Sequence, residues 1–289
     1  MLFRSVVLSL IAVPTILRFA GWQEVFLITG ALGFIWILLW WRYYEVPQRQ
    51  KRLSAAEREW ITQDEKSMIP EKAVPVRWTR LLRHPQTWAY VMGKAFIDPI
   101  YWFFLFWLPS YFASAFDLNM KVLSPELMII YLSTTVGSIS GGYLSSALIR
   151  KGWPTLKARK AALLLFALLE LCIFGNLWVS QAWIAVLLLS ICVAAHQAWA
   201  SNIFTMAADL FPVQVVSSVV GIGGMAGAVG GILFPWMIGE ILDAYKAAGD
   251  LQGGYHLIFS ICGCTYLLTL GVIHKLTKGK DKVSLSGLQ

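Results

Sequence analysis

Charged residues are scarce in this chain of 289 residues. They make up 14% of the sequence, whereas soluble globular domains carry about a quarter. Hydrophobic residues make up 57%, and the mean hydropathy is +0.63. So small a share of charge argues against a soluble globular domain, and the composition predicts an integral membrane protein.

Cysteine is also rare, and motifs of catalysis are missing. The four cysteines lie within apolar stretches, where they act as small buried residues rather than as a disulfide framework. Cys262 and Cys264 lack both the spacing and the histidine partner that a zinc site requires. The sequence holds no HExxH, GxSxG, P-loop or paired-carboxylate arrangement. We therefore predict that the chain is not an enzyme and uses no metal ion or cofactor.

Acidic residues are fewer than basic ones, so the formal net charge is +8. This excess does not indicate a nucleic-acid-binding protein, since the basic residues lie between the apolar stretches. The positive-inside rule places such residues on the cytoplasmic side of a membrane. We predict that the chain is embedded in a lipid bilayer and binds no nucleic acid.

Long apolar runs are abundant. A membrane-crossing helix needs about 20 apolar residues. Eight stretches qualify, at residues 3–20, 22–44, 86–113, 126–149, 159–179, 182–207, 214–241 and 254–275. Between the second and third lies a polar, mostly basic segment in which Ser54 and Glu57 form a capping box ahead of a short amphipathic helix. The basic loops predict that both termini are cytoplasmic.

The third stretch carries the residues that cost most in a membrane. Lys94, Asp98 and Tyr101 share one helical sector, with Trp102 close to it. One interpretation is that Lys94 and Asp98 only neutralise each other as an i, i+4 pair. The other is that Lys94 binds an anionic substrate while Asp98 orients that substrate or holds Lys94 when the site is empty. Trp102 would then stack on a sugar ring.

Polar groups continue between residues 196 and 231, where two apolar stretches meet at Phe211 and Pro212. The residues Gln197, Ser201, Thr205 and Asp209 recur every four positions, with Asn202 beside them. They therefore form one stripe, from which His196 points about 100° away. Such a stripe usually faces a bundle interior or a wet cavity, because lipid offers no hydrogen-bond partner. Hydrogen bonds between helices are the alternative interpretation for each single residue.

Glycines recur at the same interval in the seventh stretch. Gly223, Gly227 and Gly231 form two consecutive GxxxG steps, and Gly137 and Gly141 form another in the fourth stretch. Both sets predict close approach of a neighbouring helix.

Glu170 is a lone carboxylate in the fifth stretch, and it has two interpretations: a proton carrier, or the partner of a polar group on a neighbouring helix.

Several long strings carry a family likeness. They are RLSAAEREWI from Arg52, GKAFIDPIYWFFLFWLPSYF from Gly93, GGYLSSALIRKG from Gly141, and HQAWASNIFTMAADLFP from His196 with SSVVGIGGMAGAVGG from Ser217. The chain resembles the major facilitator superfamily, and within it the hexuronate transporter branch of the anion:cation symporter family. The resemblance implies proton-coupled symport of sugar acids such as galacturonate or glucuronate across the bacterial inner membrane, by alternating access between two six-helix halves.

The expected fold is an all-α, polytopic membrane helix bundle. It would comprise two helices from the end of the N-terminal half (1–44), a cytoplasmic central loop (45–85), the six-helix C-terminal half (86–276) and a cytoplasmic tail (277–289). Four further helices would complete a family member. The alternative is a transport-inactive half-domain, or an interaction partner of a separate N-terminal half. The predicted substrate-binding residues are Lys94, Asp98, Tyr101, Trp102, Gln197, Ser201 and Asn202.

Overall fold

The computed structural model describes residues 12–13, 15–17, 19–46, 49–50, 52–62, 78–118, 125–280 and 282–284. Contacts divide the chain into two compact units, Met1–Pro75 and Val76–Gln289. All regular elements in the described ranges are helices. The predicted all-α membrane helix bundle is therefore confirmed, while the four predicted segment boundaries stay predictions.

The first unit contains α2 (Trp22–Tyr43) and α3 (Ala55–Thr62). None of the α2 residues is buried, and its length and hydropathy suit a membrane span. At the start of α3 the predicted capping box is present. The backbone N–H of Glu57 donates to Ser54 Oγ at 3.2 Å, and the backbone N–H of Ser54 donates to Glu57 Oε2 at 3.0 Å.

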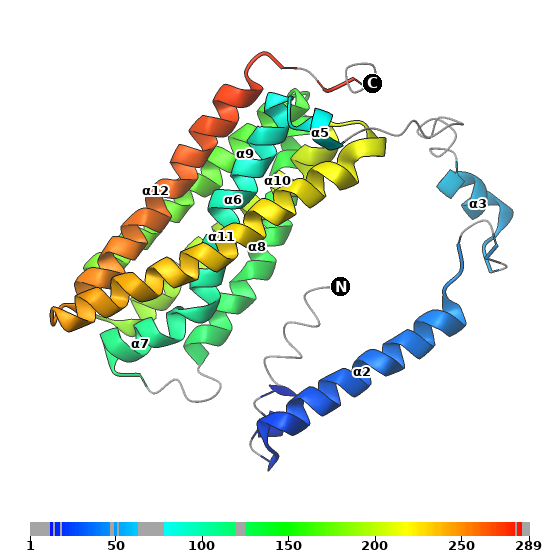
Figure 1. The fold of residues 1–289 in the computed structure, drawn as a ribbon. Coiled ribbons are helices and arrows are strands. Elements are labelled where there is room, and N and C mark those ends of the chain that lie inside the picture. Colours follow the sequence, from blue (N-terminus) through cyan, green and yellow to red (C-terminus); the bar gives the residue numbers. More distant parts are fainter. Residues whose placement is uncertain are drawn as a thin grey trace. The chain divides into compact units, whose positions relative to one another are not determined.

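The second unit is a bundle of long helices (Figure 1). Its elements are α5 (Trp78–Leu81), α6 (Pro85–Phe106), α7 (Leu108–Phe116), α8 (Pro125–Arg150), α9 (Thr155–Glu170), the 3-10 helix η1 (Leu171–Leu177), α10 (Ala182–Leu210), α11 (Val213–Ala247) and α12 (Leu251–Thr277). Helix α10 packs against α8, α9 and α6, and α11 and α12 both pack against α6.

Six helices in the described ranges are long and apolar enough to cross a membrane, and the bent pair of α6 and α7 makes a seventh. These coincide with seven of the eight predicted stretches. The remaining one, residues 3–20, falls largely outside the described residues.

The predicted third span, 86–113, is two helices rather than one straight helix. Helices α6 and α7 meet at Trp107 with a bend of 52°. Pro109 explains the break, because it has no N–H to donate to the carbonyl of Leu105, four residues earlier. The hydroxyl of Tyr131 on α8 donates to that carbonyl at 3.2 Å and to the carbonyl of Phe104 at 3.1 Å. The broken backbone is thus satisfied inside the bundle.

Aromatic side chains fill the core around this bend. Tyr111 and Phe112 on α7 pack with Phe103 on α6 and with Tyr255 and Phe259 on α12. All five are buried. This cluster fixes the position of α6 relative to α12, and so fixes the face that α6 turns towards α10 and α11.

Candidate functional site

The charged pair on α6 is formed. Lys94 Nζ lies 2.6 Å from Asp98 Oδ2. Lys94 is buried, with 6% of its surface exposed, while the Asp98 side chain is 26% exposed. A salt bridge of this kind is stable only when both charges are matched, because an unpaired charge away from water costs several kcal/mol (roughly 3–5). Both interpretations of the pair require this contact, so the contact alone does not choose between them.

The glycines of α11 lie against this polar face. A Cβ atom on Gly227 would be 2.6 Å from Asp98 Oδ2, and a Cβ on Gly231 would be 2.6 Å from Trp102 Nε1. A Cβ on Gly223 would be 3.3 Å from Lys94 Cγ. The predicted close approach of another helix is therefore confirmed, and that helix is α6. Both helices use a four-residue interval, so Gly227 meets Asp98 and Gly231 meets Trp102, while Gly223 meets Lys94 and, more closely, the ring of Tyr90.

Pro99 contributes to the same contact. It leaves the carbonyl of Ala95 without its helical N–H partner. Gly230 of α11 faces this position, because a Cβ there would be 2.6 Å from the Ala95 oxygen. The helices can approach this closely at Ala95 only because residue 230 has no side chain.

Helix α10 supplies the third side of the site. The Lys94 ammonium lies over the ring of Phe204, 4.1 Å from the ring centroid. Cations favour the face of an aromatic ring at this distance. Lys94 therefore lies between a carboxylate on its own helix and an aromatic ring on α10. Phe204 was not predicted as a site residue, although it follows Ser201 by three positions and so lies beside it on the helix surface.

Tyr101 connects the site to a buried polar pair. Its ring stacks on His196 with centroids 5.3 Å apart, and His196 Nδ1 lies 2.7 Å from the hydroxyl oxygen of Tyr266 on α12. His196 is buried, whereas Gln197 is half-buried. This agrees with the prediction that His196 lies off the Gln197 stripe.

The predicted stripe on α10 splits between two surroundings. Asn202 is fully buried and donates from Nδ2 to the carbonyls of Gly141 on α8, at 3.0 Å, and of Ala198, at 2.9 Å. Ser201 Oγ donates to the carbonyl of Ala198 at 2.9 Å and lies close to Gly141. Asn202 therefore lies in the contact between α8 and α10, and its substrate role stays a prediction.

The last member of the stripe belongs to an ion-pair network. Asp209 Oδ2 accepts from Arg159 Nε at 2.8 Å, and Arg159 Nη1 donates to Ser145 Oγ at 2.6 Å. These three side chains come from α10, α9 and α8. They tie together the ends of three helices.

Glu170 lies at the end of α9, where the helix changes to 3-10 geometry. It is fully buried, and in the described part of the chain neither carboxyl oxygen has a hydrogen-bond partner. The interpretation of Glu170 as a partner for a polar group on another helix finds no such group there.

Comparison with known proteins decides the family. The family model described as Major Facilitator Superfamily matches residues 4–235. The chain belongs to the Major Facilitator Superfamily. It is a multi-pass membrane protein of a transporter family rather than an enzyme family, as the sequence predicted.

Relatives of this superfamily member include named transporters. A D-galactonate transporter of Escherichia coli O6:H1 is 24% identical over 265 residues, which cover 89% of this chain and 61% of the relative. A hexuronate transporter of Escherichia coli K12 is 26% identical over 268 residues, covering 92% and 60%. A galacturonate transporter of Dickeya chrysanthemi is 32% identical over 125 residues, covering 43% and 36%. The chain thus spans about 60% of the length of the first two relatives.

Proposed function

We propose that this superfamily member is the C-terminal half, with the last two helices of the N-terminal half, of a proton-coupled symporter for sugar acids such as hexuronates. The observation that carries the proposal is the pair of buried Lys94 and half-buried Asp98 against a glycine face of α11. An intramembrane cation with only one charged partner suits a substrate that brings a second carboxylate. The names of the relatives supply the substrate class, since galactonate, galacturonate and the other hexuronates are all sugar acids.

The side chains divide the work of binding. With no substrate bound, Asp98 neutralises Lys94. The substrate carboxylate then replaces Asp98 as the partner of the Lys94 ammonium, which Phe204 holds from the other side. Trp102 is 37% exposed and offers its ring face to the apolar face of a sugar. Tyr101, Gln197 and Ser201 supply hydroxyl and amide groups for the sugar hydroxyls.

Charge distribution supports an orientation for the proposal. The lysines near the start of α9 and those at the end of α12 gather around one crevice, and so lie at the same end of the bundle. By the positive-inside rule this end is cytoplasmic. We therefore place both termini and the loop 45–85 in the cytoplasm of a bacterial cell, with the helices in the inner membrane.

The alternative is that the 289-residue chain does not transport by itself. The observation behind it is that the chain spans about 60% of the length of its relatives. A six-helix half forms only one side of a cavity between two halves. In that case the chain would be a transport-inactive half-domain or would act with a separate N-terminal half.

Uptake into proteoliposomes tests both versions. Labelled galacturonate uptake, driven by an inward proton gradient, is measured for the chain alone and for the chain fused behind the N-terminal helices of the hexuronate relative. Uptake by the fusion alone supports the half-domain version, and uptake by both supports an autonomous transporter. If neither the chain nor the fusion takes up galacturonate, galactonate or another sugar acid named for the relatives, the proposed sugar-acid function is overturned.

In the active form, Lys94→Ala is compared with Lys246→Ala, which removes an exposed lysine at the end of α11. Loss of a charge-assisted hydrogen bond of about 1.5–3 kcal/mol raises the substrate KM roughly 10-fold to 100-fold. Lys246→Ala is expected to leave KM unchanged. An unchanged KM in Lys94→Ala would show that the Lys94–Asp98 pair only neutralises itself.

A further inference from the structure

A pocket elsewhere in the bundle is lined by residues far in sequence from Lys94 and Asp98. It is a crevice of about 850 Å³ between the first half of α9 and the last half of α12. None of the residues that line it belongs to α6, α10 or α11. The crevice is therefore separate from the proposed substrate site.

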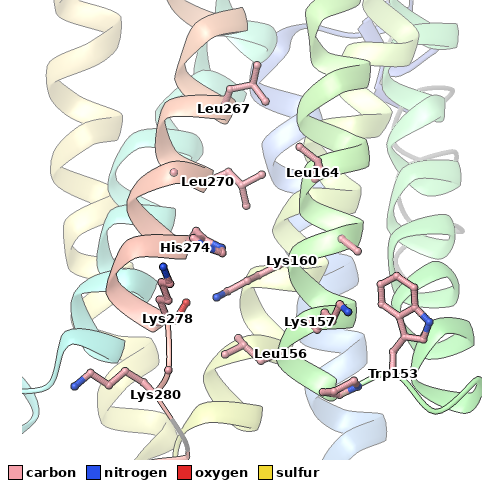
Figure 2. A pocket seen from close by; sticks show the side chains of 15 residues that line it. Trp153, Leu156, Lys157, Lys160, Leu164, Leu267, Leu270, His274, Lys278 and Lys280 are labelled. Atoms are coloured by element: carbon pink, nitrogen blue, oxygen red, sulfur yellow. The ribbon is translucent and has the colours of Figure 1, made fainter.

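The mouth of the crevice is strongly basic. Four lysines line it, Lys157, Lys160, Lys278 and Lys280. In Figure 2, Lys160 points from α9 towards α12, where Lys278 and His274 face it. No carboxylate is among the lining residues. The described part of the chain has two salt bridges, and their cations are Lys94 and Arg159 rather than these four lysines. Among the described residues, the crevice thus offers several positive charges without an internal counter-ion.

The inner part of the crevice is apolar. Leu164 on α9 faces Leu267 and Leu270 on α12 (Figure 2). Leu164 lies about one turn beyond Lys160, and Leu270 and Leu267 lie about two and three turns before Lys278. Leu164 is 45% exposed. Basic groups at one end and leucines further along the helix axis reproduce the order of a lipid, whose anionic headgroup lies above its acyl chain.

We propose that this crevice is a binding site for an anionic phospholipid such as phosphatidylglycerol. The phosphate lies between Lys160 and Lys278, and one acyl chain runs along Leu164, Leu267 and Leu270. Charge complementarity selects an anion, and the leucine wall between two membrane-crossing helices selects a lipid over a small soluble anion. The proposal does not depend on the transport function or on which side of the membrane the crevice faces.

Two pairs of variants separate this site from general attraction of lipid to a basic protein. Lys160→Gln with Lys278→Gln removes two charges from the crevice, and Lys246→Gln with Lys275→Gln removes two lysines that do not line it. Gly271→Phe fills the crevice, since a Cβ there would meet nothing within 4 Å. Gly142→Phe is its control, because it has the same open space on α8 but does not line the crevice.

The 289-residue chain is purified in a neutral detergent, and lipid binding is measured by native mass spectrometry and by the thermal midpoint. Phosphatidylglycerol, phosphatidylcholine and inorganic phosphate are the three probes. We expect phosphatidylglycerol to bind and to raise the midpoint of the unaltered chain, while the other two do neither. The crevice double variant should bind phosphatidylglycerol roughly tenfold more weakly or worse, and Gly271→Phe should also weaken it, with both controls unaffected.

Three results would overturn the proposal. Equal binding of phosphatidylglycerol by the crevice and control double variants would mean that attraction is general. An equal effect of inorganic phosphate would mean that the site takes a small anion. An equal effect of phosphatidylcholine would mean that charge does not select the lipid. If the crevice double variant does not fold, Gly271→Phe against Gly142→Phe decides the question by itself.

Discussion

Gly227 of α11 lies directly against the carboxylate of Asp98 on α6. A Cβ at position 227 would be 2.6 Å from Asp98 Oδ2 and 3.4 Å from Asp98 Cβ. The same carboxylate lies 2.6 Å from Lys94 Nζ. The position of one glycine on α11 is therefore coupled to the geometry of the charged pair on α6.

Gly227→Ala is expected to displace the Asp98 carboxylate and weaken its pairing with Lys94. Overpacking of a close helix contact costs about 1–3 kcal/mol, so the midpoint of thermal unfolding in detergent should fall. Gly221→Ala is the matched control, because a Cβ there meets nothing within 4 Å. The predicted contact is wrong if the two alanine variants unfold at the same temperature.

Asn202→Ala should weaken the contact between α8 and α10. It removes the hydrogen bond from Asn202 Nδ2 to the carbonyl of Gly141, and interhelical hydrogen bonds in membranes are worth about 0.6–1.7 kcal/mol. Thr205→Ala serves as control, since among the described residues the Thr205 hydroxyl donates to carbonyls of its own helix. Equal unfolding midpoints of the two variants would contradict this assignment.

The pair of Arg159 and Asp209 should be energetically coupled. Arg159 is 9% exposed, so Asp209→Asn leaves a largely buried guanidinium that still donates to Ser145 but has lost its charged partner. We expect a loss of about 1–3 kcal/mol for each single variant, and less than the sum for Asp209→Asn with Arg159→Gln. A double-mutant cycle on unfolding free energies measures this. Strictly additive losses would show that the pair is not coupled.

Glu57 carries the clearest pH dependence outside the membrane spans. Its pKa is lowered from 4.5, first by the hydrogen bond from the backbone N–H of Ser54 and then by the Ser54 hydroxyl. Because the folded pKa lies below the unfolded one, the contribution to helix α3 is present above pH 4.5 and is lost as the pH falls through the folded value. An NMR titration of Glu57 checks the direction. Ser54→Ala should move the pKa of Glu57 upward towards 4.5, and no movement would exclude the capping box as its cause.

Most of the helices could be predicted from the sequence, because apolar runs of membrane length report on the bilayer rather than on neighbours. The break at Trp107 could not be placed in the same way. Pro109 signals a break, but the run of aromatic residues across it is apolar enough to continue a span. The break is stable because Tyr131 on α8 satisfies the freed carbonyl, and this partner is known only once the helices are packed.

The candidate site, too, could be predicted only in part from the sequence. The 100° helical step correctly placed Lys94 with Asp98 and set His196 apart from Gln197. The step gives directions around one helix, but not the neighbour that each direction meets. For that reason Asn202, next to the predicted stripe, lies against Gly141, and Phe204, which was not predicted, lies over Lys94. The glycines of α11 predicted a close neighbour, and packing then identified it as α6.

Along part of the contact between α6 and α11, the surface of α11 consists of glycine, and the side chains come from α6. At three successive turns α11 presents Gly223, Gly227 and Gly231, while α6 presents Lys94, Asp98 and Trp102. Because the glycines have no side chains, α6 can pack this closely only where its own side chains face them. A shift of α11 by four residues would leave two of the three α6 side chains against glycine and would bring the third against Val219 or Pro235. The length of the glycine run therefore fixes a single register between the two helices.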